Sequence, residues 1–483
     1  MRSSRLLITA SLMALLTGCA MGPDYHRPHA PNFRSYDNEV PPETVSADDP
    51  HGAKQVFASN ESLPAEWWTL FQSPELNELI TQALRHSPDL EAASANLRAA
   101  NEDLAAGEGY LLPSINGSFT SQRQKTSGNN NGGNFKGSVY TVHNASVSVS
   151  YGIDLFGGTR RAVEELESFR DYQAYELEAA RLSLTANVVT TAIQEASLRE
   201  QLAATQKLVD EQTKQVDIAK QQLDAGAITR LVYLSQKTTL DQTRANFAPL
   251  EKQLAQTRHA LSVLLGDFPV NAPKHMFRLD TLRLPERLPL SLPSQLVEQR
   301  PDIRAAEANL HAASAEIGVR EAARLPQLTL SADMGSVANA LGKLLTPGSG
   351  IWAFGGNVTQ SIFDAGTLAH KQGSAEAKFD AAAAIYRKTV LVAFQDVADT
   401  LRALDADAKE LQAQAEAEKS AAETLSLARD QFEAGAISYL SLLDSVNAEQ
   451  KSRIALIQAQ AQRYADTAAL FQALGGGWTT RKK

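Results

Sequence analysis

Two long segments of the chain repeat apolar residues at steps of three and four positions, which is the spacing of an amphipathic helix. Residues 159–248 contain no proline and one glycine, Gly226, and residues 374–474 contain no proline and one glycine, Gly435. A helix of about 60 residues would be about 90 Å long, a length typical of coiled coils. We therefore expect two long helices in each segment, with a reversal at the lone glycine, which suits a left-handed helix cap.

Shorter segments alternate with a period of two, which predicts β-strands. In residues 147–153 every second residue is apolar and the others are serine or glycine, and residues 327–334 alternate in the same way. One apolar and one polar face is typical of a transmembrane barrel strand that encloses water, although a soluble sandwich with one wet face would show the same alternation. We predict strands at about 113–125, 139–156, 326–337 and 351–363.

The chain contains one internal repeat with a spacing of about 210 residues. Residues 87–97 match residues 300–310, and an Ala-Gly-Ala-Ile sequence surrounds both Gly226 and Gly435. Each repeat is predicted to hold a helix, two strands and two long helices. The expected boundaries are 76–265 for the first repeat, 266–294 for an equatorial linker, 295–474 for the second repeat and 475–483 for a C-terminal tail.

Four strands are too few to close a barrel. They would therefore either lie in a soluble sheet or combine with strands from other copies of the chain. Three copies would supply about twelve strands, enough for an open lumen on the scaling between small closed barrels and porins. After the N-terminal region the sequence has no run of eighteen apolar residues, so we expect any membrane crossing to use strands.

The N-terminus resembles a bacterial lipoprotein signal. Arg2 and Arg5 precede about eleven apolar residues, which is too short to span a bilayer, and the run ends in a Leu-Thr-Gly-Cys sequence at Cys19. This sequence resembles a lipobox, which implies removal of residues 1–18 and attachment of S-diacylglycerol and N-palmitoyl groups to Cys19. Ala20 follows the cysteine and, by the same resemblance, indicates the outer membrane. Residues 19–75 are rich in proline and are expected to be extended.

Composition excludes several classes of function. The net charge is -9 with dispersed Lys and Arg, which argues against nucleic-acid binding. Cys19 is the only cysteine, so no disulfide or thiolate cluster forms within one chain. The sequence has no HExxH or GxSxG motif, and the glycine-rich loop that begins at Ser127 lacks the Gly-Lys-Ser or Gly-Lys-Thr of a phosphate-binding loop. We therefore expect no catalytic residue, no metal site and no bound cofactor.

Several motifs together resemble those of the outer membrane factors of the TolC superfamily, closest to the NodT-like lipoprotein branch. They are Cys19 with Gly22-Pro23-Asp24-Tyr25, Trp67-Trp68, Asp154-Leu155-Phe156-Gly157, Arg300-Pro301-Asp302-Ile303, Leu325-Pro326, Phe363-Asp364-Ala365-Gly366, and Tyr439-Leu440-Ser441-Leu442-Leu443-Asp444. The resemblance implies an α+β homotrimer in which a twelve-stranded outer-membrane barrel continues into a periplasmic α-helical coiled-coil tunnel. It also implies a periplasmic adaptor, an inner-membrane transporter of the RND or MFS type, and export of small molecules such as drugs or toxic compounds.

The same resemblance assigns candidate site residues. Asp444 matches the family position that lines the periplasmic entrance, and threefold symmetry would make it a ring of three carboxylates. Ser441 lies one turn earlier, where some relatives carry a second aspartate. Tyr439 and Arg230 are candidates to hold the closed state by hydrogen bonds. The turns at Gly226 and Gly435 are expected to meet the adaptor.

Two alternatives remain open from the sequence. The chain could serve as the outer-membrane channel of a type I protein secretion system, which has the same architecture. The chain could also be a coiled-coil scaffold or adhesin without a channel. That class explains the long helices but not the alternating strands or the twofold repeat.

Overall fold

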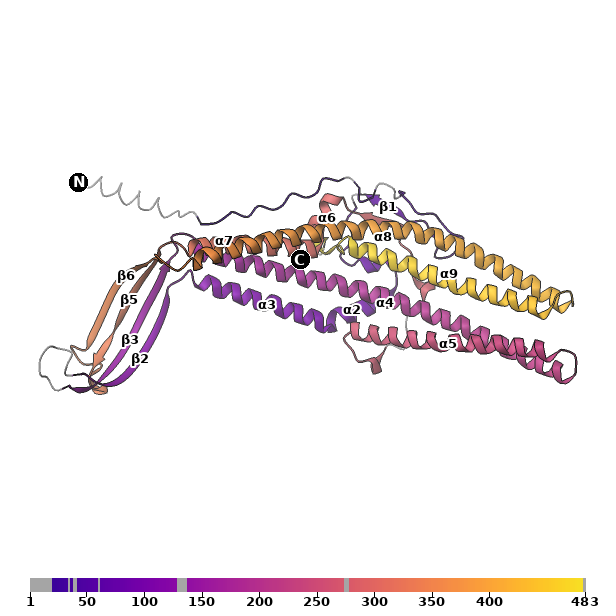
Figure 1. Cartoon of the computed structure of the whole chain (residues 1–483), viewed down its shortest axis with the longest axis horizontal. Coiled ribbons are helices and arrows are strands. Elements are labelled where there is room, and N and C mark those ends of the chain that lie inside the picture. The colour runs from indigo at the N-terminus through magenta and orange to yellow at the C-terminus, as the bar shows by residue number, and fades with distance from the viewer. Residues whose placement is uncertain are drawn as a thin grey trace. The chain divides into compact units, whose positions relative to one another are not determined.

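The computed structural model describes residues 20–33, 35–37, 41–59, 61–127, 137–272 and 278–480. Over these residues the protein has an α+β fold that combines very long helices with a four-stranded antiparallel sheet (Figure 1). The described chain divides into two compact units. The first unit holds the described parts of Met1–Pro28, Asn96–Ala174 and Ala305–Arg387, and the second holds those of His29–Ala95, Tyr175–Arg304 and Lys388–Lys483.

The two sequence repeats form the same series of elements. In the first repeat these are α2 (Pro74–His86), α3 (Pro88–Gly109), β2 (Ser114–Lys125), β3 (Val139–Ile153), α4 (Gly158–Asp224) and α5 (Arg230–Leu264). In the second they are α6 (Pro293–Gln299), α7 (Pro301–Ala322), β5 (Gln327–Ala338), β6 (Gly350–Thr359), α8 (Thr367–Glu433) and α9 (Tyr439–Ala473). Helices α4 and α8 each have 67 residues, and α5 and α9 each have 35. The predicted duplication is confirmed.

The single helix expected before each strand pair is wrong, because a break divides it in two. Ser87 separates α2 from α3, and Arg300 separates α6 from α7; both have extended backbone angles. Each precedes a proline, whose ring disfavours the helical conformation of the residue before it. Arg300 then closes the break, because its guanidinium binds the Asp302 carboxylate at 2.7 Å, Asp396 at 2.9 Å and the Ala473 carbonyl at 3.1 Å.

The strand register gives the main sheet one apolar and one polar face. The strand order is β2-β3-β5-β6, and all neighbours are antiparallel. Val147, Met334 and Trp352 are aligned across β3, β5 and β6, whereas the next row, Ser148, Asp333 and Ala353, belongs to the opposite face. Trp352 is 81% exposed and Met334 71% exposed, so the apolar face has no cover within the described chain.

Two of the strands end earlier than predicted. β3 ends at Ile153 instead of about 156, and β6 ends at Thr359 instead of about 363. In each case an aspartate just before the following helix binds an amide of the first helical turn. The Asp154 carboxylate accepts a hydrogen bond from the Arg160 amide at 2.9 Å, and Asp364 accepts one from the Leu368 amide at 2.9 Å. The family motifs at these positions are therefore helix caps rather than strand ends.

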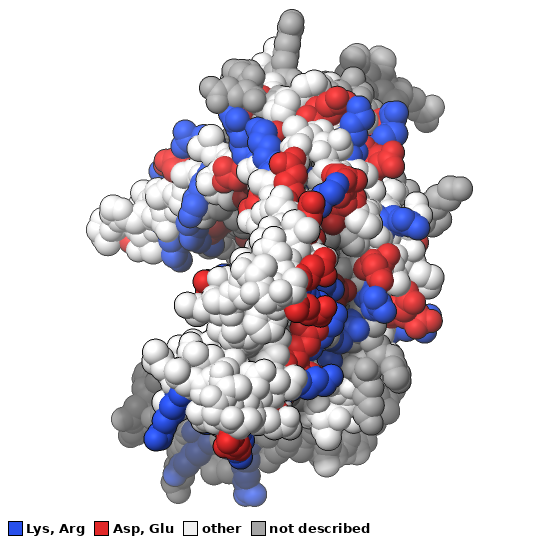
Figure 2. Space-filling view, turned by 90° about the vertical axis from the view of Figure 1, so that its right-hand side faces the viewer, with Lys and Arg blue, Asp and Glu red and all other residues white. Residues whose placement is uncertain are grey.

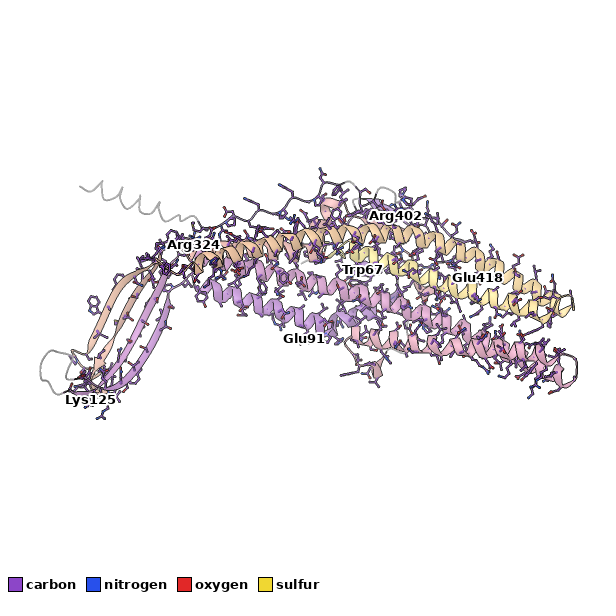
Figure 3. All side chains as sticks on the ribbon, viewed as in Figure 1. Trp67, Glu91, Lys125, Arg324, Arg402 and Glu418 are labelled. Atoms are coloured by element: carbon purple, nitrogen blue, oxygen red, sulfur yellow. The ribbon has the colours of Figure 1, made fainter. Side chains whose placement is uncertain are left out.

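The second unit has an aromatic core around Trp67, whose position on the ribbon is labelled in Figure 3. Trp67 is 1% exposed and its ring lies 5.6 Å from that of Phe471, while Phe71 packs against both Phe471 and Tyr464. Burial of each such ring contributes about 1.5–3 kcal/mol.

The second unit also holds a small two-stranded sheet, in which β1 (Val56–Ser59) pairs in parallel with β4 (Arg287–Leu290). The short 3-10 helices are η1 (Trp67–Phe71), η3 (Pro269–Asn271), η4 (Leu279–Thr281), η5 (Leu341–Lys343) and η6 (Trp478–Thr480).

A buried carboxyl group on α8 makes the second unit sensitive to pH. Asp407 is 9% exposed, and burial together with the neighbouring Asp466 raises its pKa from 3.8 to about 8. Glu410 raises this pKa further and Arg463 opposes the shift. The folded state therefore retains a proton that the unfolded state loses, so the free energy of unfolding falls as the pH rises from about 4 to about 8.

We expect Asp407→Asn to remove this fall of the free energy of unfolding with rising pH, because the asparagine side chain does not ionise in this range. The measurement is the unfolding midpoint at several pH values between 4 and 9. Asp48→Asn is the matched control, since Asp48 forms an exposed ion pair with Lys419. An equal pH slope in the wild type and Asp407→Asn would contradict the assignment.

Candidate functional site

Both helical hairpins reverse through the same backbone motif. Gly226 has φ of +73° and Gly435 has φ of +71°, a left-handed conformation that favours glycine. The Ala227 amide donates to the Gln222 carbonyl at 2.8 Å, and the Ala436 amide donates to the Gln431 carbonyl at 2.8 Å. These bonds satisfy the last carbonyls of α4 and α8 and form a Schellman cap. The lone glycines therefore lie at the reversals, as the sequence predicts.

A hydroxyl group begins the second helix of each hairpin. The Thr229 side chain accepts from the Val232 amide at the start of α5, and the Ser438 side chain accepts from the Ser441 amide at the start of α9. The two caps have nearly identical backbone angles, with φ near -78° and ψ near 154°. Ser441 thus has a local structural contact, since its hydroxyl also lies 3.0 Å from that of Ser438.

Tyr439 joins the two hairpins near their turns. Its hydroxyl donates to the Gln215 side-chain carbonyl on α4 at 2.7 Å, and its ring meets Phe432 edge to face. Burial raises the pKa of Tyr439 to about 12, so the hydroxyl stays protonated and able to donate. The ring packs on a cluster of buried residues formed by Leu208, Leu425, Ala428, Leu442 and Val446. Sequence reasoning did not identify Gln215, because no local pattern marks a residue 224 positions away.

The remaining predicted gate residues are exposed. Asp444 lies on α9, two residues after the buried Leu442 and two before the buried Val446, and its own side chain is exposed. Its carboxylate has no hydrogen-bond partner among the described residues. Arg230 is the first residue of α5 and is also exposed. Among the described residues, the Tyr439 hydroxyl binds Gln215 and forms no hydrogen bond with Asp444 or Arg230. Asp444 and Arg230 are therefore available to groups outside the chain.

A groove of about 860 Å³ lies between α4, α8 and α9 in the second unit. Both signs of charge line it: Glu211 lies 3.5 Å from Arg429, and Glu449 lies 3.8 Å from Arg453. Acidic and basic side chains also lie next to one another on the surface in Figure 2. The sequence did not predict this groove, since its lining comes from helices far apart in the chain.

Cys19, the predicted acylation site, lies outside the described residues, but the residues directly after it are firmly held in the first unit. The Met21 amide donates to the Phe156 carbonyl at 3.0 Å. Arg161, which is buried, binds the Met21 carbonyl at 3.1 Å and the Asp24 carboxylate at 2.7 Å. A Cβ on Gly22 would lie 2.4 Å from the Gly318 Cα, and a Cβ on Gly318 would lie 2.5 Å from the Met21 carbonyl oxygen, so neither position has room for a side chain. Sequence reasoning did not identify Arg161, which lies 137 residues from Asp24.

The described part of the chain also bears on metal binding and on helical membrane spans. No group of three or more His, Cys, Asp or Glu side chains could hold a metal ion there. None of the described helices is both long enough and apolar enough to cross a membrane.

Comparison with known proteins gives a consistent family match. The family model described as outer membrane efflux protein matches residues 79–267 and 292–476. The pyoverdine export outer membrane protein OpmQ of Pseudomonas putida is 31% identical over 448 residues, which cover 90% of this chain and 94% of OpmQ. The probable outer membrane lipoprotein SilC of Salmonella typhimurium is 29% identical over 480 residues, or 98% of each chain.

The solved structures give the same fold. The outer-membrane channel OprN superimposes with a TM-score of 0.84 at 25% sequence identity, and the match covers 95% of this chain and all of the OprN chain. Because the match spans both repeats and both kinds of element, the helices and the main sheet belong to one shared architecture.

The turn at Gly435 gives a direct stability test. Gly435→Ala should lower the free energy of unfolding by about 1–2 kcal/mol, because a left-handed conformation costs an L-residue that much, and Gly435→Val should lower it further. The space around Gly435 is open, so a steric clash contributes nothing.

The matched control is Gly373→Ala in α8, where space is also open but the backbone is helical. It should raise the free energy of unfolding by about 0.5–1 kcal/mol. Denaturant unfolding measures both changes. A neutral or stabilising Gly435→Ala would rule out the strained turn.

Proposed function

Because the chain belongs to the outer membrane efflux protein family, we propose that it works as a homotrimer in which three main sheets close one twelve-stranded barrel. The chain is an outer-membrane channel of an efflux pump and not an enzyme. Two features of the main sheet support the trimer. Its apolar face is exposed, and among the described residues the outer edges of β2 and β6 have no partner strand. Unpaired edges would be very costly in hydrocarbon.

The internal repeat supplies a template for the contact between copies. β3 of the first repeat pairs with β5 of the second, and their counterparts at the free edges are β6 and β2. Ser114 and Gln327 are counterparts, because each follows a Leu-Pro pair at the same place in its repeat. Ser114 pairs with Ser150 and Gln327 pairs with Thr359, so residues 141–150 of β3 correspond to residues 350–359 of β6. Suppose that β6 of one copy pairs with β2 of the next in the way that β3 pairs with β5 within the chain. The counterpart of the pair Val147 and Met334 is then Gly356 of one copy opposite Ser121 of the next.

We therefore expect the double variant Ser121→Cys and Gly356→Cys to form a disulfide between copies. Paired positions bring Cβ atoms to about 4–5.5 Å, which a disulfide accommodates. Oxidation followed by denaturing electrophoresis should give linked trimers.

The control is Gly117→Cys with Gly356→Cys, which is offset by four residues and so by about 13 Å. Equal linking of both pairs, or linking of the control alone, would contradict this register. A protein that remains monomeric under native conditions would contradict the trimer itself.

We propose that the long helices form a periplasmic tunnel and that the turns at Gly226 and Gly435 meet a periplasmic adaptor, which connects to an inner-membrane transporter of the RND or MFS type. Both turns are exposed and have open space around the glycine, which suits them to a protein contact. OpmQ is named for pyoverdine export, and we propose small organic molecules, such as drugs or toxic compounds, as the exported class for this chain.

We also propose that Cys19 carries an N-palmitoyl and an S-diacylglycerol group that insert in outer-membrane lipid. The lipobox sequence and the similarity to SilC, a probable lipoprotein, support this. The attachment of Met21 and Asp24 to Arg161 supports it too, because it holds the residues after the cysteine at the end of β3, where the sheet meets the helices. An anchor there would enter the leaflet nearest the helices.

Cys19→Ser should abolish incorporation of a fatty-acid probe, since no other cysteine is present. Metabolic labelling followed by purification measures this. The matched control is Ser35→Ala, which keeps the cysteine and should label normally. Persistent labelling of Cys19→Ser would disprove acylation at this position.

For the entrance, we propose that Asp444 forms a ring of three carboxylates in the closed state, with Ser441 one turn away and with Tyr439 and Arg230 stabilising that state. Asp444 and Arg230 are exposed in the single chain, as a contact between copies would require. Two carboxylates about 6 Å apart repel by about 3 kcal/mol at an effective dielectric of about 20, so the ring should attract cations.

Asp444→Ala should therefore abolish block of the channel by divalent or trivalent cations. Single-channel conductance in planar bilayers, with and without these cations, measures the effect. Asp430→Ala, close to the same turn on α8, serves as the control and should keep the block. Identical block of the wild type and Asp444→Ala would remove Asp444 from the entrance.

A further inference from the structure

The polar face of the main sheet carries a single charged group among the described strand residues. That group is Asp333 on β5, which pairs with Ser148 on β3 and Ala353 on β6. Beyond Ser148, the row continues to Asn116 on β2. The other side chains of this face are uncharged, mostly serine, threonine, asparagine and glutamine, with glycine and a few apolar residues.

No described basic residue offsets this charge on the same face. Arg123 and Lys125 have the parity of the apolar face and lie near the loop end of β2, where Figure 3 marks Lys125. The Asp333 side chain is exposed, and within the described chain its carboxylate has no hydrogen-bond or ion-pair partner. It is thus a free negative charge on an otherwise neutral surface.

We propose that Asp333 is the residue that gives the barrel a preference for cations, at a position separate from the periplasmic entrance. This rests on the proposed trimer, in which the apolar face meets lipid and the polar face lines the lumen. Threefold symmetry places three Asp333 carboxylates at one height, facing water. Charges on lumen-facing positions set the selectivity of such barrels.

The size of the lumen determines when this preference is measurable. Twelve strands spaced about 4.8 Å apart and tilted by about 40° give a backbone diameter of about 24 Å. The axis then lies about 8–10 Å from the carboxylates, which equals the Debye length near 0.1 M salt. At about 0.01 M the Debye length is about 30 Å and the field fills the lumen, whereas at about 1 M it is about 3 Å and the axis is screened.

The experiment measures reversal potentials in planar bilayers across a tenfold KCl gradient, once at low and once at high salt. All channels carry Asp444→Asn, so that the proposed carboxylate ring at the entrance is absent from every measurement. We expect this channel to prefer K⁺ over Cl⁻ several-fold near 0.01 M and to lose the preference near 1 M. Adding Asp333→Asn, which keeps the side-chain size, should bring the low-salt permeability ratio close to one.

A relocated charge separates electrostatics from structural damage. Asp333→Asn combined with Ser148→Asp moves the carboxylate to the adjacent strand at the same height and should restore the preference. An unchanged low-salt reversal potential in Asp333→Asn, or failure of the relocated charge to restore it, would overturn the role of Asp333 and leave the channel assignment intact. A trimer that conducts no ions in any variant would instead overturn the proposed function along with this inference.

Discussion

The backbone N–H and C=O groups along the outer edges of β2 and β6 need hydrogen-bond partners, and the rest of the structure depends on this requirement. Inside the sheet, β3 and β5 have partners on both sides, but the outer edges of β2 and β6 have none among the described residues. The sheet also exposes Trp352, Phe354 and Met334 on one face. A soluble domain would cover such a face and shield such edges. This sheet does neither among the described residues, which is the reason for proposing that three copies close one barrel.

The duplication explains how one chain can provide both sides of the missing contact. The contact between β3 and β5 joins one repeat to the other, and the free edges of β2 and β6 are the repeat-related counterparts. The helices, too, place repeat-related residues in different surroundings. Ala305 on α7 is 2% exposed, whereas its repeat counterpart Ala92 on α3 is exposed. Related sequences thus have different surroundings in the single chain, and a ring of copies would make those surroundings equivalent.

The sequence predicted the features that depend on local periodicity or on one special residue. The strands followed from alternation, and the turns at Gly226 and Gly435 followed from lone glycines within long helical segments. The breaks before Pro88 and Pro301 were missed, although the rule that a proline disfavours helix at the preceding residue could have located them. The contacts of Arg161 with Asp24 and of Tyr439 with Gln215 could not be predicted, because they join residues more than 100 positions apart and no pattern marks either partner.

Amide hydrogen exchange of the native protein in lipid nanodiscs tests the closed sheet most directly. If copies pair edge to edge, the outward amides of β2 and β6 should exchange as slowly as those of β3 and β5, because each donates to a strand of the next copy. Rapid exchange confined to the outward amides of β2 and β6, with β3 and β5 protected, would show that the edges remain open and would contradict the barrel.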